Sequence, residues 1–223
     1  MSQPKIAVMM DEDTSCGGEN YGLSKDYFSA ISRAGGLPFG IPYLPEIVSE
    51  VIQSFDGFFA VGGSAALPDE WYLSRAGSTH PKSERVPVEI AIMKGFLERD
   101  KPVFGSCHGM QVLAGIHGCK LQHSVNEAVH RQEHKVTLSP NSRIFQITGQ
   151  PEFIVNSRHR EAVAKISDPV VAGAIAPDGT IEEIEVLGKA FAIGCQWHQE
   201  NFWRENHPGN KLFDAFISAA LKR

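Results

Sequence analysis

The sequence has few of the features that mark secreted, membrane or nucleic-acid-binding proteins. It lacks a Cys-x-x-Cys pair, and the spacing of its four cysteines argues against a disulfide framework. No run approaches the roughly 18 apolar residues that a membrane-spanning helix needs. Lysine and arginine number 21 against 26 acidic residues, so no positive excess is available to neutralise nucleic-acid phosphates. We therefore expect a cytoplasmic protein with no nucleic-acid or membrane partner.

Length and composition are those of an ordinary globular protein. The chain has 223 residues, of which 42% are hydrophobic and 21% are charged. A chain of this size buries roughly 70% of its unfolded surface, so it needs neither disulfides nor a metal to fold. No linker, repeat or low-complexity tract interrupts the sequence. We expect a single domain over residues 1–223.

Short apolar runs alternate with segments of helical periodicity in the first half of the chain. This order predicts a parallel sheet with helices on both faces. Ser24 is the expected N-cap of the first helix, which the glycine pair at Gly35 ends. The expected strands are 6–10, 37–41, 57–61 and 103–106, and the expected helices are 24–34, 84–99 and 110–116.

The second half reads mainly as strands. The turn Pro177-Asp178-Gly179 predicts a hairpin between two of them. The fold class expected for the whole chain is α/β, with an open, mostly parallel sheet, helices on both faces and extra antiparallel strands in the second half. The expected elements are strands at 134–138, 153–156, 170–176, 181–187 and 191–195, and a closing helix at 212–221.

The sharpest motif is Gly105-Ser106-Cys107-His108-Gly109, which directly follows an apolar strand. It has the form of a nucleophile elbow, in which glycines are needed because side chains there would collide with the neighbouring strand and helix. The turn would raise the Cys107 thiol above the carboxyl edge of the sheet, at a helix N-terminus that favours thiolate. The alternative is a buried cysteine in a tight turn.

A cysteine nucleophile needs a base, and His198 follows the last expected strand with Glu200 two residues on. In an extended segment, side chains two residues apart point the same way, so Glu200 could accept the imidazole N–H of His198. Cys107, His198 and Glu200 would then form a catalytic triad. The alternative is that His198 is an ordinary surface or core histidine.

These motifs, with GG at Gly62, VNSRH from Val155 and APDGTIEEIE from Ala176, give a resemblance over nearly the whole chain. The chain resembles the class I glutamine amidotransferase-like superfamily. Within it the chain resembles the γ-glutamyl-γ-aminobutyrate hydrolase family of cysteine peptidases. The resemblance implies a flavodoxin-like fold and hydrolysis of a γ-glutamyl amide bond through a γ-glutamyl thioester, without a cofactor or metal.

The resemblance also implies the role of each site residue. Cys107 would be the nucleophile, His198 the base and Glu200 its orienting carboxylate. Backbone N–H groups of Gly63 and His108 would form the oxyanion hole, while the His108 side chain points away. The glutamyl group would be held by Gln111, Asn156, Ser157 and His159, with Arg158 and Arg160 flanking that turn.

Three departures from the family pattern point to an altered leaving-group preference. Gln199 replaces the usual proline between His198 and Glu200, and the loop after Gly63 lacks the usual acidic residue. The usual second histidine of the VNS segment is replaced, because Arg160 follows His159. The leaving amine stays open among γ-aminobutyrate, a polyamine, a polyglutamate and an amino acid.

Further polar clusters carry weaker hypotheses. The acidic group Asp11, Glu12, Asp13 and Glu19 reads as a solvated loop, or as favouring a cationic leaving amine if it closes over the site. Trp71 and Tyr72 are candidate pocket walls, and Cys195 is expected to be buried and inert. A second group matches no helical metal-ligand spacing and reads as a polar loop: His117, His123, His130, His134, Glu127 and Glu133.

The predicted function is hydrolysis of a small-molecule γ-glutamyl substrate, and a homo-oligomer is left open. One alternative is a glutaminase subunit that supplies ammonia to a separate synthase. Another is a non-catalytic member of the same fold that acts as a redox sensor or binding module. Retention of Cys107, His198 and Glu200 together argues against the last alternative.

Overall fold

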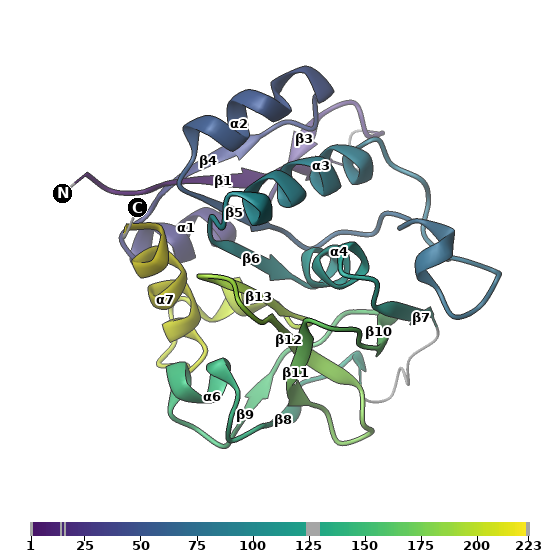
Figure 1. Cartoon of the computed structure of the whole chain (residues 1–223), viewed down its shortest axis with the longest axis vertical. Coiled ribbons are helices and arrows are strands. Elements are labelled where there is room, and N and C mark those ends of the chain that lie inside the picture. The colour runs from purple at the N-terminus through teal and green to yellow at the C-terminus, as the bar shows by residue number, and fades with distance from the viewer. Residues whose placement is uncertain (1, 14, 16, 124–129, 222–223) are drawn as a thin grey trace.

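One nine-stranded sheet organises the molecule, in the order β4-β1-β5-β6-β13-β12-β11-β8-β9 (Figure 1). The computed structural model describes residues 2–13, 15, 17–123 and 130–221. Five strands are parallel: β4 (Leu37–Ile41), β1 (Lys5–Met9), β5 (Gly57–Ala60), β6 (Val103–Ser106) and β13 (Ala192–Cys195).

The sheet continues past β13 with antiparallel strands, which confirms the mixed α/β fold class expected from the sequence. These strands are β12 (Ile181–Val186), β11 (Val170–Ile175), β8 (His134–Leu138) and β9 (Glu152–Val155). The hairpin predicted at Pro177-Asp178-Gly179 joins β11 to β12, and Ala176 N–H donates to the Thr180 carbonyl across it at 2.9 Å.

Two small antiparallel pairs lie outside the main sheet. They pair β10 (Glu161–Lys165) with β7 (Lys120–His123), and β2 (Asp11–Glu12) with β3 (Tyr21–Gly22). Neither pair is among the elements expected from the sequence, because strands this short, or this polar, carry no clear apolar alternation. Both contribute segments to the surroundings of the elbow described below.

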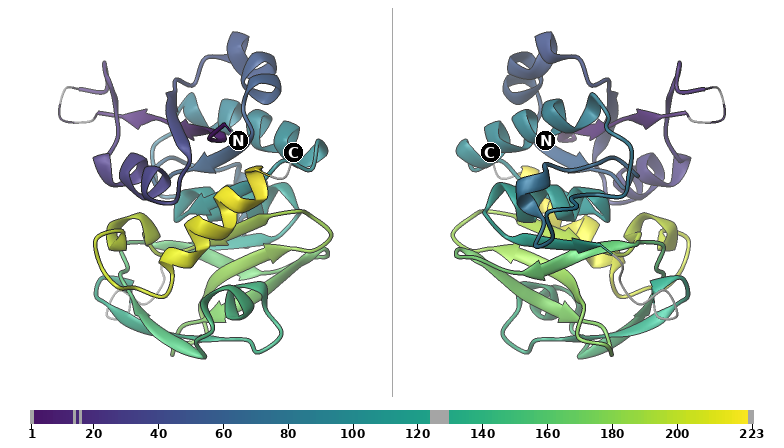
Figure 2. Two further views of the ribbon diagram at one scale, coloured as in Figure 1. Left: turned by 90° about the vertical axis from the view of Figure 1, so that its left-hand side faces the viewer. Right: turned by 90° about the vertical axis from the view of Figure 1, so that its right-hand side faces the viewer.

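Helices cover both faces of the sheet because neighbouring residues of each buried strand point to opposite sides. Phe58 and Ala60 pack with α2 (Val48–Ser54), α3 (Arg85–Glu98) and α4 (His108–Ile116). Phe59 and Phe104 pack on the other face with α1 (Lys25–Arg33) and α7 (Asn210–Leu221). Figure 2 shows α7, in yellow, in front of the strands in the left view and behind them in the right view.

A side-chain cap that the sequence signals explains where α1 begins. The Ser24 side chain accepts a hydrogen bond from Asp26 N–H and caps α1, as predicted. The short helices α2 and α6 (Arg143–Thr148) are too brief for their periodicity to be recognised. Three 3₁₀ turns lie at Pro45–Ile47, Asp69–Trp71 and Gln199–Phe202. Among the described helices, none has the length and apolar character needed to cross a membrane.

Candidate active site

Cys107 occupies the sharp turn between β6 and α4. Its φ of 51° and ψ of −103° lie in a region that a residue with a side chain rarely adopts, which costs on the order of 1–3 kcal/mol. A Cβ on Gly109 would stand 2.2 Å from the Ala60 carbonyl oxygen of β5, and one on Gly105 would stand 2.6 Å from the Gly109 backbone. The strained elbow with two sterically required glycines is therefore present as predicted.

The sheet register places the second motif beside the elbow. Cys195 of β13 pairs with Ser106 of β6, and Cys107 N–H donates to the Cys195 carbonyl at 2.7 Å. Strands β6 and β13 are parallel, so their carboxyl ends meet at the same edge of the sheet. The segment that carries His198 therefore leaves the sheet next to Cys107.

His198 and Glu200 form a close pair at this edge. His198 Nδ1 lies 2.6 Å from Glu200 Oε1, and the Ser106 hydroxyl donates to Glu200 Oε2 at 2.9 Å. Burial of His198 opposes its positive charge, but the Glu200 charge and hydrogen bonds to Cys107 and Glu200 outweigh it and raise its pKa to about 10. A pKa of about 10 means that the His198 imidazole is protonated at neutral pH.

The backbone of His198 is fixed by Asn156. The Asn156 side chain accepts from His198 N–H at 2.8 Å and donates to the His198 carbonyl at 3.0 Å. Both the oxygen and the nitrogen of the Asn156 side-chain amide therefore hydrogen-bond to the His198 backbone. The contacts that the structure shows fix the backbone of His198, and the expected substrate contact of Asn156 stays a prediction.

A buried ion-pair network supports the loop at Gly62 and Gly63. The Arg85 guanidinium donates to the carbonyls of Val61 and Gly62 at 2.8 and 2.9 Å, and both nitrogens that face Glu89 lie 3.0 Å from its carboxylate. Arg85 and Glu89 are fully buried. Burial raises the pKa of Glu89, but Arg85 outweighs it and holds that pKa below its usual value.

The two residues expected to supply oxyanion donors both lie near Cys107. His108 is the first residue of α4, so its N–H belongs to the helix turn whose donors have no partner within the helix. Its side chain points away from the thiol, as expected, and Nε2 lies 3.4 Å from Glu89. Gly63 lines the same cavity as Cys107. The roles of these two N–H groups stay predictions.

Sequence reasoning missed Gln196, which lies at the end of β13. Its side-chain amide donates to the Cys107 sulfur at 3.5 Å, a contact that stabilises thiolate. Gln111 donates both to Gln196 Oε1 at 3.2 Å and to the Glu161 carbonyl at 2.8 Å. Gln196 directly follows the strand that leads to His198, and this position is the sequence signal that could have identified it. Ser106 and Arg85 were missed as well, because the sequence does not show the Glu200 contact of Ser106 or the backbone carbonyls that Arg85 binds.

A cavity of about 510 Å³ opens beside Cys107. Of the residues predicted to hold or flank the glutamyl group, all but Asn156 line it. Three arginines against one glutamate make the cavity wall basic. The lining side chains include Cys107, Gln111, Arg131, Ser157, Arg158, His159 and Arg160.

Two further cavities adjoin His198, and acidic side chains line both. The first, of about 480 Å³, is lined by Asp11, Glu12 and Asp13 together with Gly63 and His198. The second, of about 500 Å³, includes Asp26, Glu133, Glu200 and Glu205. Asp11, Glu12 and Asp13, which follow the first strand, thus lie next to His198.

Other sequence candidates lie elsewhere. The Tyr72 hydroxyl donates to Glu161, and Trp71 packs against Gly115, so neither is among the described residues that line the main cavity. Cys195 is fully buried, and burial raises the pKa of its thiol well above the usual value, which is typical of an inert cysteine. Glu127 lies outside the described residues.

The candidate histidines separate into two groups. His117 ends α4 and His123 ends β7, whereas His130 and His134 lie together with Glu182 behind the cavity wall. These three side chains are the described group whose donor atoms are arranged to hold a metal ion.

Comparison with known proteins places this site in a family. A model of the peptidase C26 family matches residues 5–200. The chain belongs to the peptidase C26 family. This family membership confirms the family resemblance and the expected class of enzyme, a hydrolase with a cysteine nucleophile.

The relatives of the chain agree with the family assignment. It is 27% identical to γ-glutamyl-γ-aminobutyrate hydrolase PuuD of Escherichia coli K12, over 98% of this chain and 94% of that protein. Its fold is similar to a Thermoplasma acidophilum structure provisionally assigned as a GMP synthase subunit, with a TM-score of 0.74, 18% identity and coverage of 100% and 96%. The glutaminase domain of Trypanosoma brucei CTPS gives a TM-score of 0.69, at 15% identity with 99% and 95% coverage.

The Glu200–His198 contact predicts a shift in the pH dependence of activity. Replacing Glu200 with glutamine removes the charge that raises the His198 pKa, so that pKa should fall from about 10 toward its ordinary value. In a profile of kcat/KM against pH, the alkaline limb should move to lower pH, and activity at pH 8 should fall about 30-fold. Glu98→Gln, an exposed change at the end of α3, is the control. An unmoved alkaline limb in Glu200→Gln would show that Glu200 does not set the protonation of His198.

Proposed function

We propose that the chain hydrolyses γ-glutamyl amides of small amines through a Cys107–His198–Glu200 triad. The observation that carries the proposal is the meeting of the strained Cys107 elbow and the His198–Glu200 pair at neighbouring parallel strand ends. The family and the printed activity of the E. coli relative support γ-glutamyl amides as the substrate class.

The first half of the reaction forms a thioester. The Cys107 thiolate attacks the γ-carbonyl carbon, and the N–H groups of Gly63 and His108 receive the negative charge that develops on oxygen. Removing one such donor typically costs on the order of 10²–10³ in rate. When the tetrahedral intermediate collapses, the carbon–nitrogen bond breaks, and protonated His198 gives its proton to the leaving amine.

The second half releases glutamate. His198, now neutral, takes a proton from water, and the hydroxide attacks the thioester carbonyl. The carbon–sulfur bond then breaks and restores the Cys107 thiolate and the His198 imidazolium. One water is consumed for each glutamate and amine released, and Glu200 holds Nδ1 of the imidazole throughout.

The charges around the elbow orient the substrate. The glutamyl α-carboxylate fits the basic cavity, where Arg131 and Arg158 contribute positive charge. Gln111 and Ser157 add polar groups to the same wall. The leaving amine receives its proton from His198, so the leaving group extends on the His198 side, where the two acidic cavities lie.

The proposed nucleophile is tested by Cys107→Ala with γ-glutamyl amides as substrates and glutamate release as the readout. Activity should fall to background, because the variant has no thiolate to form the acyl-enzyme. Cys119→Ala removes another buried cysteine away from the site and should keep its activity. Glutamate release by Cys107→Ala at the wild-type rate would make the assignment wrong.

The acidic cavities beside His198 predict a preference for cationic leaving amines. A γ-glutamyl diamine should show a kcat/KM about tenfold or more above that of a γ-glutamyl ω-amino acid, and the ratio should shrink at high salt. The double change Glu12→Gln and Asp13→Asn should reduce the ratio, whereas Glu98→Gln should not. Equal rates for both amines at low salt would contradict the prediction.

Glutamine and γ-glutamyl amines, tested side by side as substrates, distinguish the proposed hydrolase from the glutaminase alternative. The fold similarity to a glutaminase domain keeps that alternative relevant. A hydrolase acts alone on γ-glutamyl amines. A glutaminase subunit would instead favour glutamine and stay nearly silent until a synthase partner is added.

A further inference from the structure

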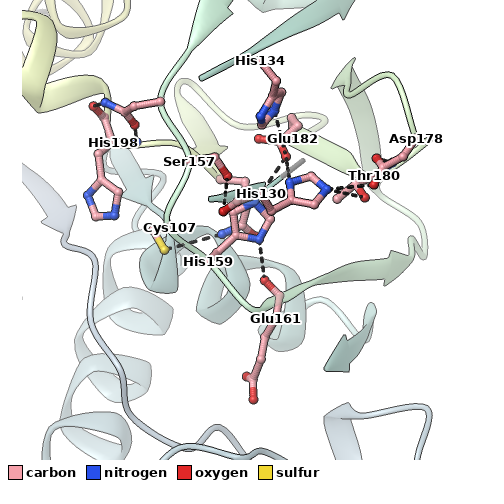
Figure 3. A network of polar contacts seen from close by, with 12 residues as sticks. Cys107, His130, His134, Ser157, His159, Glu161, Asp178, Thr180, Glu182 and His198 are labelled. Atoms are coloured by element: carbon pink, nitrogen blue, oxygen red, sulfur yellow. Dashed lines mark hydrogen bonds and ion pairs between the residues drawn. The ribbon is translucent and has the colours of Figure 1, made fainter. Parts of the chain in front are cut away.

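Three histidines converge on one buried carboxylate behind the wall of the main cavity (Figure 3). His130 Nδ1 and His159 Nε2 each lie 3.3 Å from Glu182 Oε1, and His134 Nε2 lies 3.5 Å from the same oxygen. Glu182 belongs to β12, His134 begins β8, and His159 precedes β10. Segments far apart in the sequence therefore bring four polar side chains to one point inside the fold.

The outward-facing atoms of two of these histidines already have partners. His130 Nε2 lies 2.9 Å from Asp178 and 3.1 Å from the Thr180 hydroxyl, and His159 Nδ1 lies 3.0 Å from the Glu161 carbonyl. A carbonyl and a carboxylate only accept, so these contacts place the ring N–H of each imidazole on its outer nitrogen. In the neutral rings, the lone pairs of His130 Nδ1 and His159 Nε2 then face the Glu182 carboxylate.

Lone pairs that face a buried carboxylate repel it unless a cation lies between them. Glu182, His130 and His159 are almost completely buried, so water does not screen the repulsion. The inward nitrogens of the three histidines and both Glu182 oxygens lack a hydrogen bond with suitable geometry among the described residues. With neutral imidazoles the cluster lacks a positive charge at its centre, which either protonation of the rings or a metal ion would supply.

The separations fit a metal ion better than they fit hydrogen bonds. Ligands at about 2.0–2.1 Å from a tetrahedral zinc ion are about 3.3–3.4 Å from one another. The nitrogen-to-oxygen distances of 3.3, 3.3 and 3.5 Å around Glu182 Oε1 match that edge length. The donor atoms of His130, His134 and Glu182 all lie within 4.8 Å of one another.

We propose that His130 Nδ1, His134 Nε2 and a Glu182 oxygen bind one Zn²⁺ ion, with His159 beside them on the same Glu182 carboxylate. Two imidazoles and one carboxylate are a donor set that suits zinc. Asp178 and Thr180 would act as the outer partners that fix the tautomer and orientation of His130, as outer carboxylates commonly do at zinc sites.

The ion would act structurally, by tying the substrate wall to the sheet. His159 lines the main cavity, and the Ser157 hydroxyl donates to the His130 carbonyl at 3.0 Å. A bound ion would therefore hold His130, and through it Ser157, against β12 and β8. Its three ligands are buried, and the proposed nucleophile is the Cys107 thiolate, so the ion would take no chemical part in the reaction.

The proposed ligand set departs from the sequence expectation of a polar loop without a metal. His130 and His134 lie four positions apart, as in a helical ligand pair, but without the H-E-x-x-H motif, and His134 begins strand β8. The proposed partner Glu182 lies 48 positions beyond His134 in the sequence. Only the fold brings these positions together.

The test uses the full chain with Cys107→Ala, because a thiolate beside His198 would itself bind zinc. After treatment with a chelator and its removal, ZnCl₂ is titrated by calorimetry, and the melting temperature is measured with and without zinc. We expect one zinc per chain and a higher melting temperature with zinc. Co²⁺ in place of zinc should give the visible absorption of a tetrahedral site.

Two variants in the same background locate the ion. His134→Gln should abolish stoichiometric zinc binding and the rise in melting temperature. Asp178→Asn, which changes only an outer partner near the surface, should weaken zinc binding about 10- to 100-fold. His117→Gln is the matched control and should bind zinc like the parent. Absence of stoichiometric zinc and cobalt binding in the parent would overturn the proposal, and so would unchanged binding in both His134→Gln and Asp178→Asn.

Discussion

The backbone of Cys107 is the constraint on which the rest of the site depends. A residue with a side chain is held at a φ of 51° because β6 enters the turn and α4 leaves it with almost no space between them. Gly105 and Gly109 make that spacing possible, since a Cβ on either would overlap backbone atoms. The strained turn places the largely buried thiol at the sheet edge beside the main cavity, and the other groups of the site lie around that point.

Two buried polar systems hold the groups around the elbow. On one side, Ser106 and His198 engage both oxygens of Glu200, which joins the end of β6 to the segment after β13. On the other side, Arg85 binds Glu89 and the carbonyls that precede Gly63. Breaking a buried pair of this kind typically costs about 3–5 kcal/mol, so both systems favour one fixed geometry of the site.

Much of this arrangement could be predicted from sequence, because elbow and strand signals are local. The parallel first half, the hairpin before β12 and the meeting of Cys107 with His198 follow from apolar runs, glycines and motif spacing. The role of Asn156 could not be predicted, since it depends on a backbone 42 residues away. Arg85, Gln196 and the cluster around Glu182 were missed for the same reason: the role of a buried polar residue depends on the partners that the fold brings to it.

The central claim is that a glutamyl group passes through a thioester on Cys107. The most direct measurement is mass spectrometry of the wild-type enzyme quenched with acid during turnover of a γ-glutamyl amide. The account predicts a mass increase of one glutamyl group, located on the peptide that contains Cys107 and absent from Cys107→Ala. Turnover without an adduct at Cys107, or an adduct on another residue, would contradict it.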